Sequence, residues 1–264
     1  MFKIITVSVF IFVIAILMSM IGRGGGNFYV PVLIAAGASM STAATSAQLL
    51  LMVTAIVATL VFHKYKMVDW KLALVIDLPT DIMAFIGGYC AHYFASYYLK
   101  LLFAGLLIIA AFFMLKPVKE RTSYGKKQFG YWNRSFGEYN YRVNLWLAIP
   151  ITAMVGFFAG MIGISGGSFK IPLMVLACGV PMRIAIGTSS AMVAVTALMG
   201  FAGHTVAGDF SFIWVVPMAC IAIVGGLLGG MISIKIDPVR LKKIFAYATL
   251  AAAGFMAVNA FMTG

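Results

Sequence analysis

The chain has 264 residues, of which 63% are of hydrophobic type and only 10% are charged. Soluble domains contain about 25% charged residues, so this composition excludes a water-soluble fold and predicts an integral membrane protein. The formal net charge is +12, but the basic residues are scattered between apolar stretches. Because no soluble domain remains to carry a binding face, we expect no nucleic-acid partner.

Eight apolar stretches follow one another along the chain, most of them near the roughly 20 residues that a transmembrane helix needs. They predict an all-α, multi-pass bundle of about eight helices, in contact with the lipid of a cell membrane. The stretches are residues 4–22, 43–62, 72–91, 101–115, 143–162, 185–203, 211–234 and 244–262. The first lacks a clear small-residue cleavage site, so we interpret it as a retained helix and not as a signal peptide.

Residues 16–37 are similar to residues 157–178, which indicates that the second half of the chain repeats the first. The similarity is looser beyond these segments, pairing Thr45 and Ser46 with Thr188 and Ser189, and Pro79 with Pro217. We predict a first transmembrane repeat at 1–115 and a second at 143–264. The matched pairs in the similar segments are Met20 with Met161, Ile21 with Ile162, Gly22 with Gly163, Gly25 with Gly166, Gly26 with Gly167, Phe28 with Phe169 and Pro31 with Pro172.

Residues 116–142 form a hydrophilic connector between the repeats, which is either a solvated linker or a binding loop. Lys and Arg near helix ends are retained on the cytoplasmic side, so we expect this loop to be cytoplasmic, and with eight crossings the amino terminus lies on the same side. An odd number of crossings per repeat would instead invert the repeats, and the sequence leaves this open. The basic residues of the loop are Lys116, Lys119, Arg121, Lys126, Lys127, Arg134 and Arg142.

Glycine interrupts the first apolar run, residues 4–37, which is too long for one straight crossing. We expect the helix to break at Gly22–Gly26 and a short second helix to carry Pro31 in its first turn. A helix that begins inside the membrane has unsatisfied N–H groups at the positive end of its dipole, which favours a bound anion. The same pattern recurs around Gly166 and Pro172, so the two breaks together predict a transport site.

The candidate anion-binding residues lie in and beside the two glycine segments. Glycine in membrane helices is often a close-packing contact, and Ser or Thr often caps or bonds the helix backbone, but duplication of the pattern favours a site. The GRGGG string is not followed by the GK[ST] of a phosphate loop, so we do not expect nucleotide binding. The candidates are Arg23, Gly24, Gly25, Gly26, Asn27, Ser165, Gly166, Gly167, Ser168 and Lys170, with the hydroxyls of Thr45, Ser46, Thr188 and Ser189.

Asp77 and Asp81 lie four residues apart, on one face of a predicted apolar helix that also contains Pro79. Acidic residues inside a membrane face the protein interior and often serve proton coupling, which is one interpretation of this pair. The alternative is that they satisfy backbone groups freed by Pro79 or pair with a lysine. The second repeat has Pro217 but no nearby acid, so either role belongs to one half.

The paired GxGGGxxxxP-like segments in two similar halves around a basic loop resemble the sulfite exporter TauE/SafE family of membrane permeases. The resemblance spans nearly the whole chain and implies secondary transport of sulfite, sulfonates such as sulfoacetate, or related sulfur-containing anions. Two residues depart from the pattern. Ser165 replaces an expected glycine, and Arg23 is an uncommon choice within the first segment.

We therefore expect a secondary transporter of a small sulfur-containing anion, with a passive anion channel as the alternative because the same glycine cradle could form a filter. No paired acid and base, His-Cys-Asp cluster or cofactor motif is apparent, so we expect no enzymatic activity, cofactor or metal. The three cysteines lack CxxC spacing and lie in apolar stretches, as buried free thiols do. The sequence leaves the oligomeric state open, with a homodimer among the alternatives.

Overall fold

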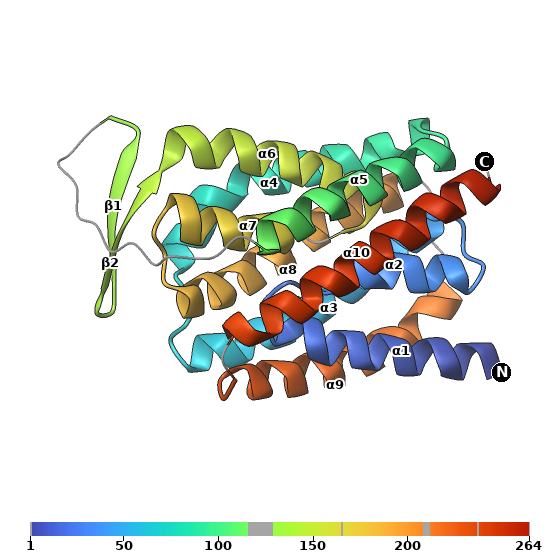
Figure 1. The fold of residues 1–264 in the computed structure, drawn as a ribbon, viewed down its shortest axis with the longest axis horizontal. Helices are drawn as coiled ribbons and strands as arrows, with labels where there is room; N and C mark the ends of the chain where they lie inside the picture. The colour runs from blue at the N-terminus through green and yellow to red at the C-terminus, as the bar shows by residue number, and fades with distance from the viewer. Residues whose placement is uncertain (1, 116–128, 165, 208–211, 237, 264) are drawn as a thin grey trace.

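The computed structural model describes residues 2–115, 129–164, 166–207, 212–236 and 238–263 and is a bundle of helices with a two-stranded sheet at one end (Figure 1). Within these ranges, six helices are long and apolar enough to cross a membrane. The predicted helical membrane bundle is confirmed.

In the described part of the chain, five α-helices make up each half. The predicted apolar stretches correspond to all of them except α2 and α7, the short helices that follow the glycine segments. The first half contains α1 (Phe2–Ser19), α2 (Gly26–Ala35), α3 (Met40–Lys64), α4 (Trp70–Cys90), a short 3₁₀ turn (Ala91–Tyr93) and α5 (Ser96–Leu115). The second half contains α6 (Leu145–Ile162), α7 (Gly167–Pro172), a π-helical turn (Leu173–Ala177), α8 (Met182–Val206), α9 (Phe212–Ser233) and α10 (Pro238–Thr263).

The two halves have opposite orientations. Helices α3 and α8 correspond, since both have 25 residues and each follows a short broken helix. The end of α3 lies at the start of α8, where the Asp69 N–H donates to Thr188 Oγ1 at 3.0 Å. The start of α3 lies near the end of α8, where Gln48 packs against Gly200. The helices are therefore antiparallel, and the repeats are inverted.

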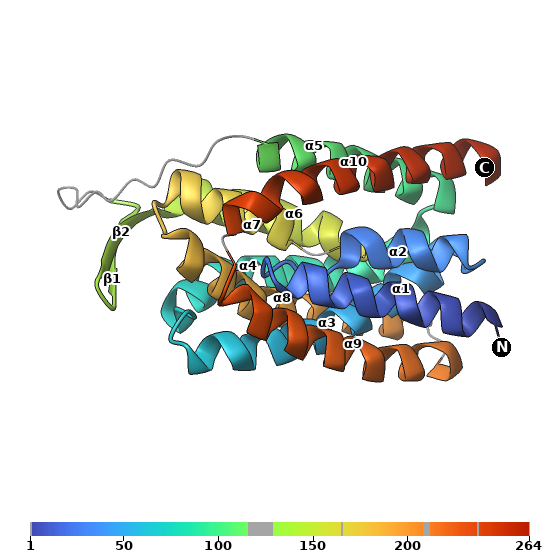
Figure 2. The ribbon, with the colours of Figure 1, turned by 60° about the horizontal axis from the view of Figure 1, so that its bottom comes forward.

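One long helix of each half packs mainly on helices of the other half. Helix α4 packs mainly on α6 and α8 of the second half, whereas α9 packs on α1 and α3 of the first, and α5 lies along α10 (Figures 1 and 2). Small residues permit the close contacts: Gly156 lies against the Thr80 carbonyl, and Gly87 against the Phe157 carbonyl. The two halves thus share one packed interior, and the division at 115 and 143 stays a prediction from the sequence.

A β-hairpin occupies the end of the segment that the sequence analysis treats as a loop; residues 116–128 lie outside the described residues. Strand β1 (Tyr131–Phe136) pairs antiparallel with β2 (Tyr139–Asn144). Gly137 permits the tight turn between them, with φ of 57°. Alternating side chains of β2, Tyr141 and Val143, are buried against the bundle. The hairpin is therefore a docked element of the fold.

The amino terminus and the hairpin lie at opposite ends of the bundle (Figure 1). The prediction that the amino terminus shares a side with the 116–142 loop is therefore wrong, because it assumed eight full crossings. Helix α1 runs into the bundle, and α2 runs back to the end at which α1 begins. Together they make no net crossing, so each half crosses the bundle an odd number of times in total.

The distribution of basic residues agrees with this corrected topology. Among the residues that the structure describes, ten Lys and Arg residues lie in the hairpin or in helix ends and connections at the hairpin end, and Lys3 and Lys100 lie at the opposite end. The ten are Lys64, Lys66, Lys71, Arg134, Arg142, Arg183, Lys235, Arg240, Lys242 and Lys243.

Candidate functional site

The predicted glycine breaks are present in both halves. Helix α1 ends at Ser19 and α2 begins at Gly26, with Gly22, Gly24 and Gly25 between them in the left-handed region at φ of 65°, 76° and 108°. Helix α6 ends at Ile162, and Gly163, which caps it, has φ of 76°. Only glycine adopts these conformations without strain, so the backbone turns where the sequence places these residues.

Each break packs closely against the backbone of a helix from the other half. A Cβ at Gly22 would lie 2.3 Å from the carbonyl oxygen of Ile186 in α8, and one at Gly163 would lie 2.5 Å from Cα of Ala44 in α3. Ile186 and Ala44 hold the same position, the fifth residue, in their helices. The two contacts are thus equivalent by the inverted repeat.

The two glycine segments meet inside the bundle. Asn27 Nδ2 in α2 donates to Ser168 Oγ in α7 at 3.0 Å. A Cβ at Gly26 would lie 2.7 Å from the Gly163 carbonyl oxygen, and one at Gly167 would lie 3.1 Å from Cα of Arg23. From this meeting point, α2 and α7 run towards opposite ends of the bundle (Figure 1). The structure therefore brings the predicted segments together.

Arg23 is a buried cation in this meeting point. Its side chain is only 2% exposed, and its Nε and Nη1 have no hydrogen-bond partner. A buried, unpaired charge is costly, so this guanidinium is suited to receive an anion. The hydroxyl of Ser189 likewise lacks a partner and lies 3.2 Å from the position of a Cβ on Gly167.

The other predicted hydroxyls have structural partners or lie elsewhere. Thr45 Oγ1 donates to the Ser41 carbonyl at 3.0 Å, and Thr188 Oγ1 accepts the Asp69 N–H. Ser46 is buried in α3, and Ser165 lies outside the described residues. Of these predicted hydroxyls, only that of Ser189 is described beside the meeting point. The sequence pairing of Thr45 and Ser46 with Thr188 and Ser189 is also one residue out of register with α3 and α8.

Lys170 belongs to a charged cluster with the acid pair. Its side chain, 1% exposed, forms an ion pair with Asp77 and donates from Nζ to Thr196 Oγ1 at 2.7 Å. Asp81 Oδ1 lies 2.8 Å from the same hydroxyl. Of the two predicted cations, Lys170 is therefore already paired, and Arg23 is not hydrogen-bonded through Nε or Nη1.

Thr196 was missed by the sequence analysis, although a signal for it existed. Thr54 and Thr196 hold the same position in α3 and α8, and each donates to the carbonyl four residues earlier. In the first half, Tyr29 takes the place of Lys170 in the repeat alignment, and its hydroxyl lies 3.2 Å from Thr54 Oγ1. Helical register, which the loose sequence similarity did not fix, identifies this pair.

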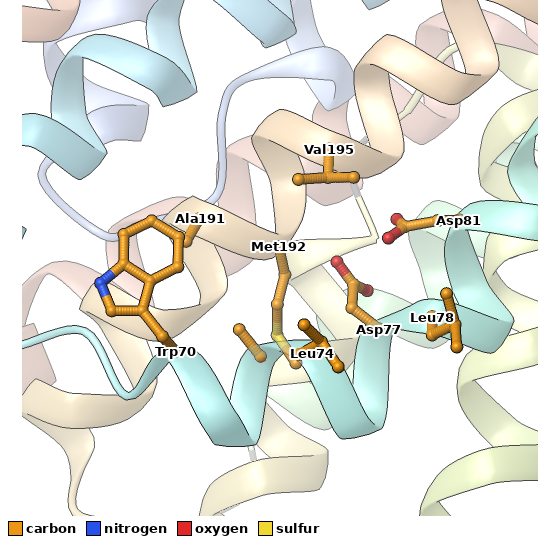
Figure 3. A pocket seen from close by; sticks show the side chains of 9 residues that line it. Trp70, Leu74, Asp77, Leu78, Asp81, Ala191, Met192 and Val195 are labelled. Carbon is orange, nitrogen blue, oxygen red and sulfur yellow. The ribbon is translucent and has the colours of Figure 1, made fainter.

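A groove between α4 and α8 leads to the acid pair, with a volume of about 350 Å³. Trp70, Leu74 and Leu78 are exposed at its rim, while Asp77 and Asp81 project from α4 towards α8 (Figure 3). The lining is otherwise apolar. Its residues are Trp70, Ala73, Leu74, Asp77, Leu78, Asp81, Ala191, Met192 and Val195.

Asp69 fastens the hairpin to the helices. Its carboxylate caps α4 by accepting from the N–H groups of Lys71 and Leu72, and it accepts two hydrogen bonds from Arg134 at 2.9 and 3.0 Å. Tyr141 donates to it as well. Burial acts to raise the pKa of Asp69, but the hydrogen bonds from Arg134 and Tyr141 outweigh it and hold this pKa below its ordinary value.

Inverted halves whose broken helices meet inside a helical bundle are an architecture of membrane transporters. The chain belongs to the sulfite exporter TauE/SafE family, whose model matches residues 7–256. It is 28% identical over 230 residues to the probable membrane transporter protein YunE of Bacillus subtilis, covering 83% of this chain and 84% of that one. It is 23% identical over 252 residues to the probable membrane transporter protein MJ0441 of Methanocaldococcus jannaschii, covering 88% and 86%. No solved structure gives a significant match. The chain is a multi-pass membrane transporter.

Proposed function

We propose that this transporter carries a small sulfur-containing anion, such as sulfite or a sulfonate, by secondary transport. The observation that carries the proposal is the buried Arg23 guanidinium, hydrogen-bonded to nothing through Nε and Nη1 where the two glycine segments meet. A tetrahedral oxyanion offers several acceptors to such a donor. The family's name supplies the chemical class of the anion.

The backbone around Arg23 supports the same site. Gly24, Gly25 and Gly26 lead into α2 without side chains that would cover the backbone, and the first N–H groups of α2 favour negative charge. Gly166, Gly167 and Ser168 approach from the second half. Movement of one half against the other would expose this site to each side in turn.

We also propose that Asp77 and Asp81 couple transport to protons, and that the hairpin end is cytoplasmic in a cell membrane. Two carboxylates around one lysine leave a surplus acidic group in the interior, which favours proton binding. The basic residues gathered at the hairpin end favour its cytoplasmic location, with both termini on the opposite side.

Transport of sulfite, thiosulfate and methanesulfonate into proteoliposomes would test the function. We expect uptake of at least one of them to saturate and to respond to a pH gradient. If folded protein moves none of the three, the assignment of a sulfur-containing anion is wrong. Flux that does not saturate and follows only the gradient of the ion itself would favour the passive channel.

Arg23→Ala tests the site. One or two charge-assisted hydrogen bonds, each worth about 1.5–3 kcal/mol, would be lost, so affinity should fall roughly 10- to 100-fold or more. Binding would be measured by titrating the purified protein with the transported anion. Arg23→Lys is the matched control because it keeps the charge and should retain part of the affinity. Unchanged affinity in Arg23→Ala would remove this residue from the site.

A further inference from the structure

Lys170 lies between the acid pair and the glycine segment of the second half. Its Nζ is paired with Asp77 and Thr196, yet it lies only 3.5 Å from the position of a Cβ on Gly166. Gly166 directly precedes Gly167, against which Arg23 is packed. These contacts place the flexible Lys170 side chain between the carboxylates and the glycines that Arg23 contacts.

Resting on the proposed function, we propose that Lys170 is the residue that couples the anion to the proton. When the site is empty, the Lys170 ammonium pairs with Asp77. When the transported anion is bound, the ammonium pairs with the anion instead. The acid pair then takes up a proton in place of the lost ammonium. Anion and proton consequently travel in the same direction, as a symport.

Charge balance in the buried cluster supports this order of events. With both acids ionised, Lys170 leaves the cluster with one surplus negative charge, and withdrawing the ammonium would leave two carboxylates uncompensated. Such groups bind protons in preference to remaining charged in a site that excludes water. Asp77 Oδ2 and Asp81 Oδ1 lie 3.3 and 2.8 Å from Thr196 Oγ1, so the single hydroxyl proton can be donated to either carboxylate while the other acid holds the added proton.

The surrounding ionisable groups do not offer a substitute for the lysine. Helix α6, which packs on α4, contains no ionisable residue. On α8, His204 bonds the Gly160 carbonyl at 2.9 Å, and Arg183 lies at the hairpin end. Arg23 lies across Gly167, and Lys100 is near the start of α5, which packs on α7. Within the described residues, Lys170 forms an ion pair with Asp77.

Proton uptake on anion binding tests the proposal. Purified protein in weakly buffered detergent would be mixed with thiosulfate or methanesulfonate, which stay ionised between about pH 5 and 9, so that only the protein changes protonation. We expect about one proton to be taken up per anion bound, and affinity to rise about tenfold for each pH unit lowered. Anion binding by the wild type without proton uptake overturns the proposal.

Variants separate the lysine from the acids. Asp77→Asn with Asp81→Asn should still bind the anion but take up no proton, and its affinity should not change with pH. Lys170→Gln should bind more weakly and also without uptake, and Lys170→Arg should restore part of the uptake. Thr196→Val should change the pH profile, whereas Thr54→Val, its counterpart in the other half, should not. Unchanged uptake in Lys170→Gln contradicts the proposal.

The outcome also distinguishes this proposal from the one on which it rests. If the wild type transports one of these anions but takes up no proton, the sulfur-anion function stands and only the role of Lys170 falls. If neither anion binds to or is moved by folded protein, and sulfite also fails, both fall.

Discussion

The inverted halves share a scaffold but differ at one buried pair. In the first half, Tyr29 contacts Thr54 in an apolar cluster. In the second half, Lys170 contacts Thr196 and is joined by two acids from α4. Helix α9, which corresponds to α4, contains no acid. The repeat therefore preserves the threonine hydroxyl and the backbone geometry, whereas the cluster around Thr196 combines Lys170 of the second half with two acids from α4 of the first.

Contacts of α4 and α9 identify the counterparts of the acids. Gly87 approaches the Phe157 carbonyl in α6, and Gly229 approaches the Ile16 carbonyl in α1. Phe157 and Ile16 correspond in the repeat, so Gly87 corresponds to Gly229. Counting back along each helix places Ala219 opposite Asp77 and Ile223 opposite Asp81, which corrects the sequence pairing of Pro79 with Pro217.

The largest expected effect comes from breaking the charged pair on one side. Asp77→Ala leaves a buried lysine without its ion-pair partner, which should destabilise the protein by about 3–5 kcal/mol. Copying the other half, with Asp77→Ala, Asp81→Ile and Lys170→Tyr together, should recover most of that stability because hydrophobic replacement of a whole buried cluster is often neutral.

Thermal unfolding in detergent would compare the single and triple variants. A triple variant less stable than Asp77→Ala would show that the halves differ in packing as well as in charge. A folded triple variant should also lose the dependence of transport on a pH gradient.

The second-largest effect concerns the left-handed glycine at the helix break in each half. Gly22→Ala and Gly163→Ala each force a side chain into a left-handed turn and onto the backbone of the opposing helix, at a combined cost of about 2–5 kcal/mol. The two variants should be destabilised by similar amounts. Gly254→Ala is the control, since a Cβ there meets nothing within 4 Å. Yield and melting temperature would measure this, and a large difference between the two variants would contradict an equivalent scaffold.

The smallest effect concerns the hairpin end. Asp69→Asn keeps a capping side chain but removes the ionic bond to Arg134, so hydrogen-exchange protection of β1 and β2 should fall roughly fivefold, corresponding to about 1 kcal/mol. Glu138→Gln, in the exposed turn, should leave protection unchanged.

The pH dependence of this contact follows from the lowered pKa of Asp69. Since the folded pKa lies below the ordinary 3.8, the stabilisation is complete above that pH and is lost as the pH falls through the folded value. Protection that is insensitive to acid in this range would show that the ionic bond does not hold the hairpin.

Much of this arrangement follows from the sequence because its causes are local. The apolar stretches give the helices, and Gly22, Gly24 and Gly25 give the first break. Pro31 lies in the second turn of α2 and not in the first turn as predicted, because α2 begins as early as Gly26. The orientation of the halves could not be obtained in this way, since it depends on whether α2 returns or continues, which composition does not determine. The partner of Lys170 was likewise open, because the acids lie on another helix and their separation from the lysine along the chain does not determine their separation in the fold.

The packing of α4 and α9 on the opposite halves has a consequence for biogenesis. When synthesis has reached residue 115, α4 has been made but α6 and α8, on which it packs, have not. Its two acids then have no lysine partner, and the groove that closes over them has one wall. The nascent first half must therefore remain loosely assembled in the bilayer until the second half arrives, and a chain truncated between the repeats cannot reach the native packing.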